Sequence, residues 1–187
     1  MSDWRKITIP VLLMFSTLLM DGGITFLFRE QLNSSVGIMV PRLIVLTLVM
    51  LAFYLEPKQL FILSLVFGFI YDSYYSGILG VYIAAFILIP YLVVQIRQII
   101  IPYFYVILLV NIVILTAMEI FVFGVYRAIG VSDLTLQIFL VDRLGATLIF
   151  NTLVFLVIGY PLKQWMKVLM NSDENKAGTN KKSVSLR

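Results

Sequence analysis

Long apolar runs, separated by short polar turns, divide the chain. A helix rises about 1.5 Å per residue and the hydrocarbon core of a bilayer is about 30 Å thick, so about 20 apolar residues can cross it. We predict six membrane-spanning helices, over residues 7–28, 36–55, 59–75, 78–94, 103–126 and 143–160. The third run is short enough to be a half-helix that enters the membrane without crossing it.

The segments between and after these runs carry turn and surface signals. Glu56-Pro57-Lys58 is typical of a turn that ends one helix and starts the next. Residues 134–141 are apolar but are followed by Asp142-Arg143, which predicts a short surface helix before the sixth span. Residues 161–170 form an amphipathic exit, and the polar, lysine-rich residues 171–187 predict a disordered cytoplasmic tail. We therefore expect one membrane domain over residues 1–170 and a tail.

Composition supports an all-α polytopic membrane protein. Of the 187 residues, 61% are hydrophobic and 13% are charged, whereas soluble domains are about a quarter charged. Cysteine and histidine are absent, which excludes disulfides, thiolate nucleophiles, histidine acid–base chemistry and the usual zinc and haem ligands. We expect no catalytic residues, no metal and no cofactor. The net charge is +4, and the tail has a basic excess that suits a lipid bilayer surface better than nucleic acid.

The distribution of lysine and arginine predicts the orientation. With six spans, both termini lie on the same side of the membrane, and short cytoplasmic loops carry an excess of these residues. The side of the termini holds Arg5, Lys6, Lys58, Arg97, Lys163, Lys167 and the lysines of the tail, whereas the other side holds Arg29 and Arg127, with Arg42 and Arg143 at helix entries. Both termini are therefore predicted to be cytoplasmic.

Charged residues inside the predicted spans share one depth. Counted along the helices, they lie within about one turn, or about 5 Å, of one another in the outer third of the bilayer. These residues are Asp21, Arg42, Asp72, Glu119 and Arg143. Three interpretations are open. They can form structural pairs, Asp21 with Arg42 and Asp72 or Glu119 with Arg143, since buried charges in membranes normally pair. They can line an outward-facing cavity for a ligand or partner, or they can extend separately to the headgroups.

A turn signal surrounds one of these acids. Gly68-x-x-x-Asp72 is followed by Gly77-x-x-Gly80, and glycine permits tight turns and close helix approach. We expect Gly68, Gly77 and Gly80 to be structural residues of this turn. The nearby Tyr71, Tyr74 and Tyr75 are interpreted as part of an interfacial aromatic belt. Asn111 and Asn151 share a lower level, near the midplane of the bilayer.

Together these motifs resemble the MreD family of rod shape-determining membrane proteins. The resemblance rests on Pro41-Arg42-Leu43, Glu56-Pro57-Lys58, the Gly68–Gly80 segment, Asn151 and Pro161, and it covers nearly the whole chain. It implies a non-enzymatic scaffold subunit of the cell-elongation machinery in the bacterial cytoplasmic membrane. The implied partners are an MreC-like single-span protein and the peptidoglycan synthase complex, with the actin-like MreB inside the cell in many bacteria. The implied fold is similar to the six-helix S-subunits of energy-coupling-factor transporters.

Two other functions are weighed against this one. The first is a small-molecule-binding S-subunit of an energy-coupling-factor-type transporter. Such subunits usually carry Ala-x-x-x-Ala on the first helix to dock their coupling protein, but residues 7–28 contain no alanine. The second is an enzyme that acts on lipid-linked substrates with Asp72 and Glu119 as its acids. Neither a metal cluster nor a nucleophile pattern accompanies these residues in the sequence.

Overall fold

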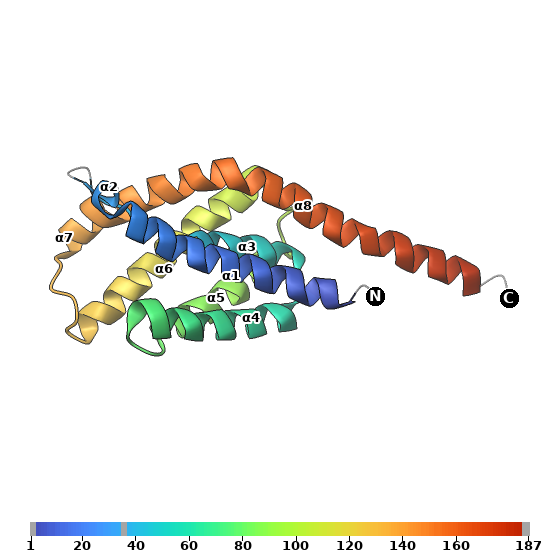
Figure 1. Ribbon diagram of the computed structural model, residues 1–187, viewed down its shortest axis with the longest axis horizontal. Helices are drawn as coiled ribbons and strands as arrows, with labels where there is room; N and C mark the ends of the chain where they lie inside the picture. Colours follow the sequence, from blue (N-terminus) through green and yellow to red (C-terminus); the bar gives the residue numbers. More distant parts are fainter. Residues whose placement is uncertain (1–2, 35–36, 185–187) are drawn as a thin grey trace.

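The computed structural model describes residues 3–34 and 37–184, with side chains over 7–33 and 37–166. The regular secondary structure of this part of the chain is helical apart from one antiparallel pair of two-residue strands, with short turns and loops between the elements (Figure 1). Its elements are α1 (Asp3–Leu27), α2 (Arg29–Leu32), β1 (Asn33–Ser34), β2 (Gly37–Ile38), α3 (Leu43–Tyr54), α4 (Pro57–Tyr71), the π-helix η1 (Asp72–Ser76), α5 (Val81–Ile96), α6 (Phe104–Ala128), α7 (Leu136–Ile138), the π-helix η2 (Phe139–Gly145) and α8 (Ala146–Val184).

Three helical segments of the described chain are long and apolar enough to cross a membrane. They are Ile7–Leu27 in α1, Phe104–Ala128 in α6, and Leu136–Met166, which ends in α8. The other predicted spans correspond to shorter helices, since α3, α4 and α5 have 12, 15 and 16 residues. At 1.5 Å per residue, α3 is only about 18 Å long. The structure is therefore an all-helical protein with three candidate spans, and the count of six stays a prediction.

The second predicted span is wrong at its start. It was expected to be helical from residue 36, but α3 begins only at Leu43. Pro41 disfavours helix at Val40, and the polar atoms of this extended backbone find partners on α8 instead. The Val40 amide donates to Thr147 Oγ1 at 3.1 Å, and the Val40 carbonyl accepts from Asn151 Nδ2 at 2.8 Å. Side chains of α8 thus provide hydrogen-bond partners for backbone groups that the expected helix would have bonded internally.

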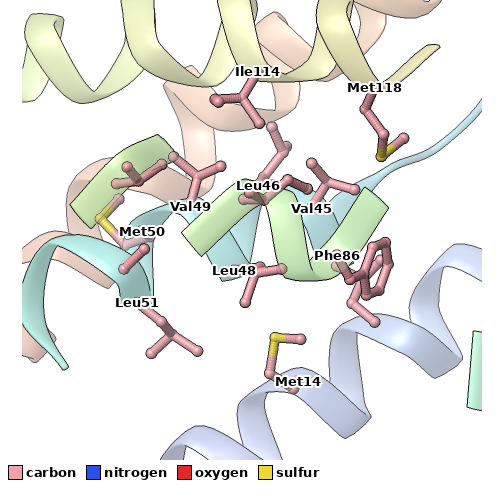
Figure 2. Packing of buried hydrophobic residues seen from close by; sticks show 14 of the residues in the cluster. Met14, Val45, Leu46, Leu48, Val49, Met50, Leu51, Phe86, Ile114 and Met118 are labelled. Carbon is pink, nitrogen blue, oxygen red and sulfur yellow. The ribbon is translucent and has the colours of Figure 1, made fainter. Parts of the chain in front are cut away.

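The short helix α3 lies at the centre of the bundle. Every residue from Leu43 to Phe53 is buried, and α3 contacts α1, α4, α5, α6 and α8. Figure 2 shows Met14 of α1, Phe86 of α5 and Ile114 of α6 around the α3 side chains. A helix that is apolar on all sides is one that other helices enclose. Much of α3 is therefore shielded from lipid by its own protein.

The corner between α4 and α5 is built on glycine, but not in the way that the sequence predicts. Gly77 and Gly80 have positive φ angles of 70° and 108° and form the turn. Gly68 lies earlier, inside α4, where an added Cβ would come 2.9 Å from the Ile83 Cα of α5. It therefore permits close packing of two helices rather than a turn. Between them, the chain continues past Tyr71 as the π-helix η1.

Different elements of the chain lie at the two ends of the bundle. The first turns of α1 and the last turns of α8 lie at the same end, with α2, the strand pair and α7 at the other (Figure 1). Within the predicted surface helix over 134–141, residues 136–138 form α7 and residues 139–141 begin the π-helix η2, which continues to Gly145. The backbone of residues 171–184 continues α8, where the sequence predicts a disordered tail, and residues 185–187 lie outside the described chain. The division at residue 170 stays a prediction.

Candidate functional site

Glu119 of α6 lies at the centre of a buried cluster of charged and polar side chains. Its Oε1 accepts from Arg42 Nε at 2.7 Å, and its Oε2 lies 3.6 Å from Arg143 Nη2. The side chains of Glu119 and Arg42 are 1% and 3% exposed, whereas that of Arg143 is 28% exposed. One acid thus pairs with two bases, closely with the buried Arg42 and more loosely with the outer Arg143.

The guanidinium of Arg42 has partners on three helices. In addition to Glu119 of α6, it donates to the hydroxyl of Tyr71 on α4 and, at 2.9 Å, to that of Tyr82 on α5. Its Cζ lies 5.8 Å and 5.2 Å from the centres of these two rings, within cation–π range. A buried ion pair needs further hydrogen bonds to offset its desolvation, and the two tyrosines supply them.

The backbone around Arg42 is held by α8. The Arg42 amide donates to Asn151 Oδ1 at 2.8 Å, and Asn151 Nδ2 also donates to Val40. Asn151 is fully buried and so links α8 to the start of α3. Asn111, predicted at the same depth, has a different partner, because its Nδ2 donates to the Ile107 carbonyl of its own helix.

Asp21 of α1 caps the start of α3. Its Oδ1 accepts from the Leu43 amide at 2.7 Å and its Oδ2 from the Ile44 amide at 3.1 Å. The first amides of a helix have no intrahelical acceptor, and the helix dipole favours a negative charge there. In an apolar interior such amides need a protein partner. Asp21 is therefore an N-terminal cap supplied by another helix.

Asp72 caps the start of α5, as Asp21 caps the start of α3. Its Oδ2 accepts from the amides of Gly80 and Ile83 at 2.7 Å and 3.1 Å, and its Oδ1 from the Tyr82 amide at 2.9 Å. The carboxylate is fully buried. The π-helix η1 and the glycine turn bring the chain back so that this acid reaches the helix that follows it.

Arg97 caps the opposite, carbonyl end of α3. Its Nη1 donates to the carbonyls of Ala52 and Leu55 at 2.6 Å and 2.7 Å. A positive charge suits the carbonyl end of a helix. The sequence predicts only that Arg97 lies in a loop. Its positive charge was the one signal in the sequence that could have suggested a role in capping the carbonyl end of a helix.

The structure gathers only part of the predicted polar layer into ion pairs. Arg42, Glu119 and Arg143 come together, whereas Asp21 and Asp72 give their carboxylates to backbone amides. The predicted pairing of Asp21 with Arg42 is thus replaced by Glu119 with Arg42, because the buried starts of α3 and α5 require acceptors.

The tyrosines near the corner have different roles, which the aromatic belt interpretation missed. Tyr71 is buried in the cluster, Tyr75 donates to the Leu18 carbonyl of α1 at 3.0 Å, and Tyr74 is exposed. Tyr82, also buried in the cluster, had no signal of its own in the sequence. Side-chain direction around a helix decides these roles, and residue type does not reveal it.

The buried cluster is closed to solvent, and this geometry fits a structural role better than a catalytic one. The inner acids and Arg42 are each at most 3% exposed, so a substrate cannot reach them without a rearrangement. Among the described residues, no group of three or more Asp and Glu side chains could hold a metal ion. What the cluster can do is fix the rotation and depth of α1, α3, α4, α5, α6 and α8 relative to one another.

Fold and site together define an all-helical membrane protein whose buried charges hold the ends of short enclosed helices. The model of the family described as rod shape-determining protein MreD matches residues 5–172, and the chain belongs to this family. The rod shape-determining protein MreD of Bacillus subtilis (strain 168) is 27% identical over 126 residues, which cover 67% of this chain and 73% of that protein. No solved structure matches the chain. The resemblance identified from the sequence is confirmed.

Proposed function

We propose that this protein is a non-enzymatic membrane scaffold subunit of the bacterial cell-elongation complex, which synthesises peripheral peptidoglycan. Membership of the MreD family supports a role in rod shape determination. The observation that carries the non-enzymatic assignment is the use of the buried charges. Asp21 and Asp72 cap helices, and Glu119 neutralises Arg42, so these acids are committed to the fold.

The proposed partner is an MreC-like single-span membrane protein, through which the scaffold connects to the synthase complex. The apolar surface of the bundle supports contacts within the bilayer. Only 22% of the spanning window of α1 is buried, and large side chains such as Phe26 and Leu27 are exposed. The polar connections are short, so the helix faces offer most of the area available to a partner.

The proposed placement is the bacterial cytoplasmic membrane, with both termini in the cytoplasm. The six longer helices of the described residues, α1, α3, α4, α5, α6 and α8, support a six-segment bundle of the kind seen in energy-coupling-factor S-subunits. The start of α1 and the last turns of α8 point toward the same end of the bundle, which supports termini on one side (Figure 1). A ligand-binding S-subunit function is less well supported, because the polar residues that would line its outward pocket are closed on one another.

Co-purification tests the scaffold assignment. The protein is expressed with an MreC-like partner from the same bacterium, either intact or with its transmembrane helix replaced by an unrelated apolar helix. We expect replacement to weaken the complex at least tenfold, whereas deletion of the partner's extracytoplasmic domain should weaken it less. The opposite ranking would place the contact outside the membrane. No complex with the intact partner in mild detergent or in nanodiscs would refute the scaffold assignment.

A further inference from the structure

A large apolar groove lies between α1 and α4, separate from the buried cluster. Its volume is about 640 Å³. Ile7, Val11 and Phe15, spaced by four residues, line it from one face of α1. On the α4 side, the buried Leu63 and Phe67 lie at its base. Because α1 and α4 both begin near the end of the bundle that holds the chain ends, the groove belongs to that half of the molecule (Figure 1).

The groove has the length of one leaflet. Its lining on α4 runs from Lys58 to Ile70, which is about 18 Å of helix. One leaflet of the hydrocarbon core is about 15 Å thick, half of the whole. A partner helix that crosses the membrane would need a groove about twice as long. The dimensions therefore favour a molecule that occupies one leaflet.

Polar groups gather at only one end of the groove. Glu56, Lys58 and Gln59, at the start of α4, and Tyr54, at the end of α3, line this end. Lys58 is exposed and can meet an anion. The Tyr54 hydroxyl is buried, and no described group forms a hydrogen bond with it. A buried hydroxyl without a partner is costly, so an acceptor from outside the chain would stabilise it.

We propose that this groove binds a phospholipid of the surrounding leaflet. The acyl chain lies along α1 and α4, an ester carbonyl accepts the hydrogen bond of Tyr54, and the phosphate lies beside the ammonium group of Lys58. Apolar side chains thus line the groove along the acyl chain, and Tyr54 and Lys58 stand at the polar end where the ester and phosphate lie. Bound in this way, the lipid fills the space between α1 and α4 and becomes part of the bundle.

Native mass spectrometry of the full-length, delipidated protein with added 1-palmitoyl-2-oleoyl-phosphatidylglycerol tests the proposal. Val66→Trp fills the groove, and Leu65→Trp is the matched control, because both positions are about half exposed on α4 but only Val66 lines the groove. We expect Val66→Trp to reduce the retained lipid at least tenfold and Leu65→Trp to leave it unchanged. Tyr54→Phe should reduce it about fivefold, the effect of one lost hydrogen bond, with Tyr91→Phe as its control.

Thermal unfolding in detergent provides the second measurement. A ligand that binds only the folded state raises the melting temperature, so the lipid should stabilise the wild type and Leu65→Trp but not Val66→Trp. If Val66→Trp does not fold, Tyr54→Phe and Lys58→Gln decide by the same two measurements. Equal retention by groove and control variants would overturn the proposal. So would a Val66→Trp protein that keeps its lipid but loses a single-span partner, because the groove would then bind a helix.

Discussion

Asp21 and Arg97 bind opposite ends of the same helix. Asp21, from α1, accepts the first amides of α3, and Arg97, beyond α5, donates to its last carbonyls. The signs match the helix dipole, with the negative group at the amide end and the positive group at the carbonyl end. A helix of 12 residues is thereby held at both ends by charges from its neighbours.

Asp21→Asn tests the capping of α3. One oxygen would remain as an acceptor, while the amide nitrogen cannot accept, so one buried backbone amide loses its partner. We expect the free energy of unfolding to fall by about 1–3 kcal/mol, measured by denaturant titration in mixed micelles. Asp133→Asn, at an exposed loop position, is the control and should change it little. Equal effects of the two substitutions would refute the capping role.

The Arg42–Glu119 pair predicts a non-additive mutant cycle. Glu119→Ala leaves the buried Arg42 without an acid, and Arg42→Ala leaves Glu119 with only the looser pairing to Arg143. Each should cost about 3–5 kcal/mol of unfolding free energy. The double variant removes both charges and should cost clearly less than the sum of the two. The same titration measures all four proteins. Strict additivity would mean that the two side chains do not interact in the membrane.

Asp72→Asn separates a structural role from a functional one. The carboxylate accepts three backbone hydrogen bonds at the start of α5, and an asparagine cannot satisfy all of them. We expect a loss of about 1–3 kcal/mol in stability, together with reduced complementation of a deletion strain. Melting temperature and cell shape are measured on the same variant. Lost cell shape with full stability would instead assign Asp72 to partner activation.

Gly68→Ala tests the close packing of α4 on α5. The new Cβ would lie 2.9 Å from the Ile83 Cα, a backbone atom that cannot move aside alone, so the helices must separate. We expect a destabilisation of about 1–3 kcal/mol. Gly124→Ala, in α6, is the control, because an added Cβ meets nothing within 4 Å and should be neutral or slightly stabilising. A tolerated Gly68→Ala would contradict the tight contact.

The proposed orientation can be tested in this chain because it contains no cysteine. Single cysteines at Asn33 and Asp133 should react with a membrane-impermeant thiol reagent applied outside the cell. Cysteines at Ser2 and Asn180 should react only after the membrane is opened. Labelling of Ser2 or Asn180 from outside, or none at Asn33, would contradict cytoplasmic termini. Blotting for each variant confirms that all are expressed equally.

The long helices could be predicted because an apolar run of sufficient length determines its own structure in a bilayer. Residues 7–28 and 103–126 were predicted, and the apolar segments are Ile7–Leu27 and Phe104–Ala128. The start of α3 could not be predicted in this way. Its extended lead-in depends on Thr147 and Asn151, which lie 107 and 111 residues further along the chain from Val40.

The sequence allows an estimate of the depth of each polar residue along its helix, but it does not identify the partners of these residues. Helical rise gives depth and says nothing of rotation, so the sequence does not reveal whether Asp21 faces Arg42 or the amides beside it. The short helices α3 and α5 also change which groups the acids bind. Once α3 and α5 begin inside the bundle, their free amides compete with arginine for the acids, and Asp21 and Asp72 go to the backbone.

The separation of Arg42 from its partner along the chain has a consequence for biogenesis. Synthesis must continue for 77 residues after Arg42 before Glu119 exists to neutralise it. Until then, the start of α3 carries a charge that lipid does not accept without cost. We therefore expect water or the insertion machinery to shelter Arg42 in the nascent segment until α6 arrives. Because Thr147 and Asn151 of α8 also hold the backbone before α3, we expect this short inner helix to reach its final place only after α8 has been made.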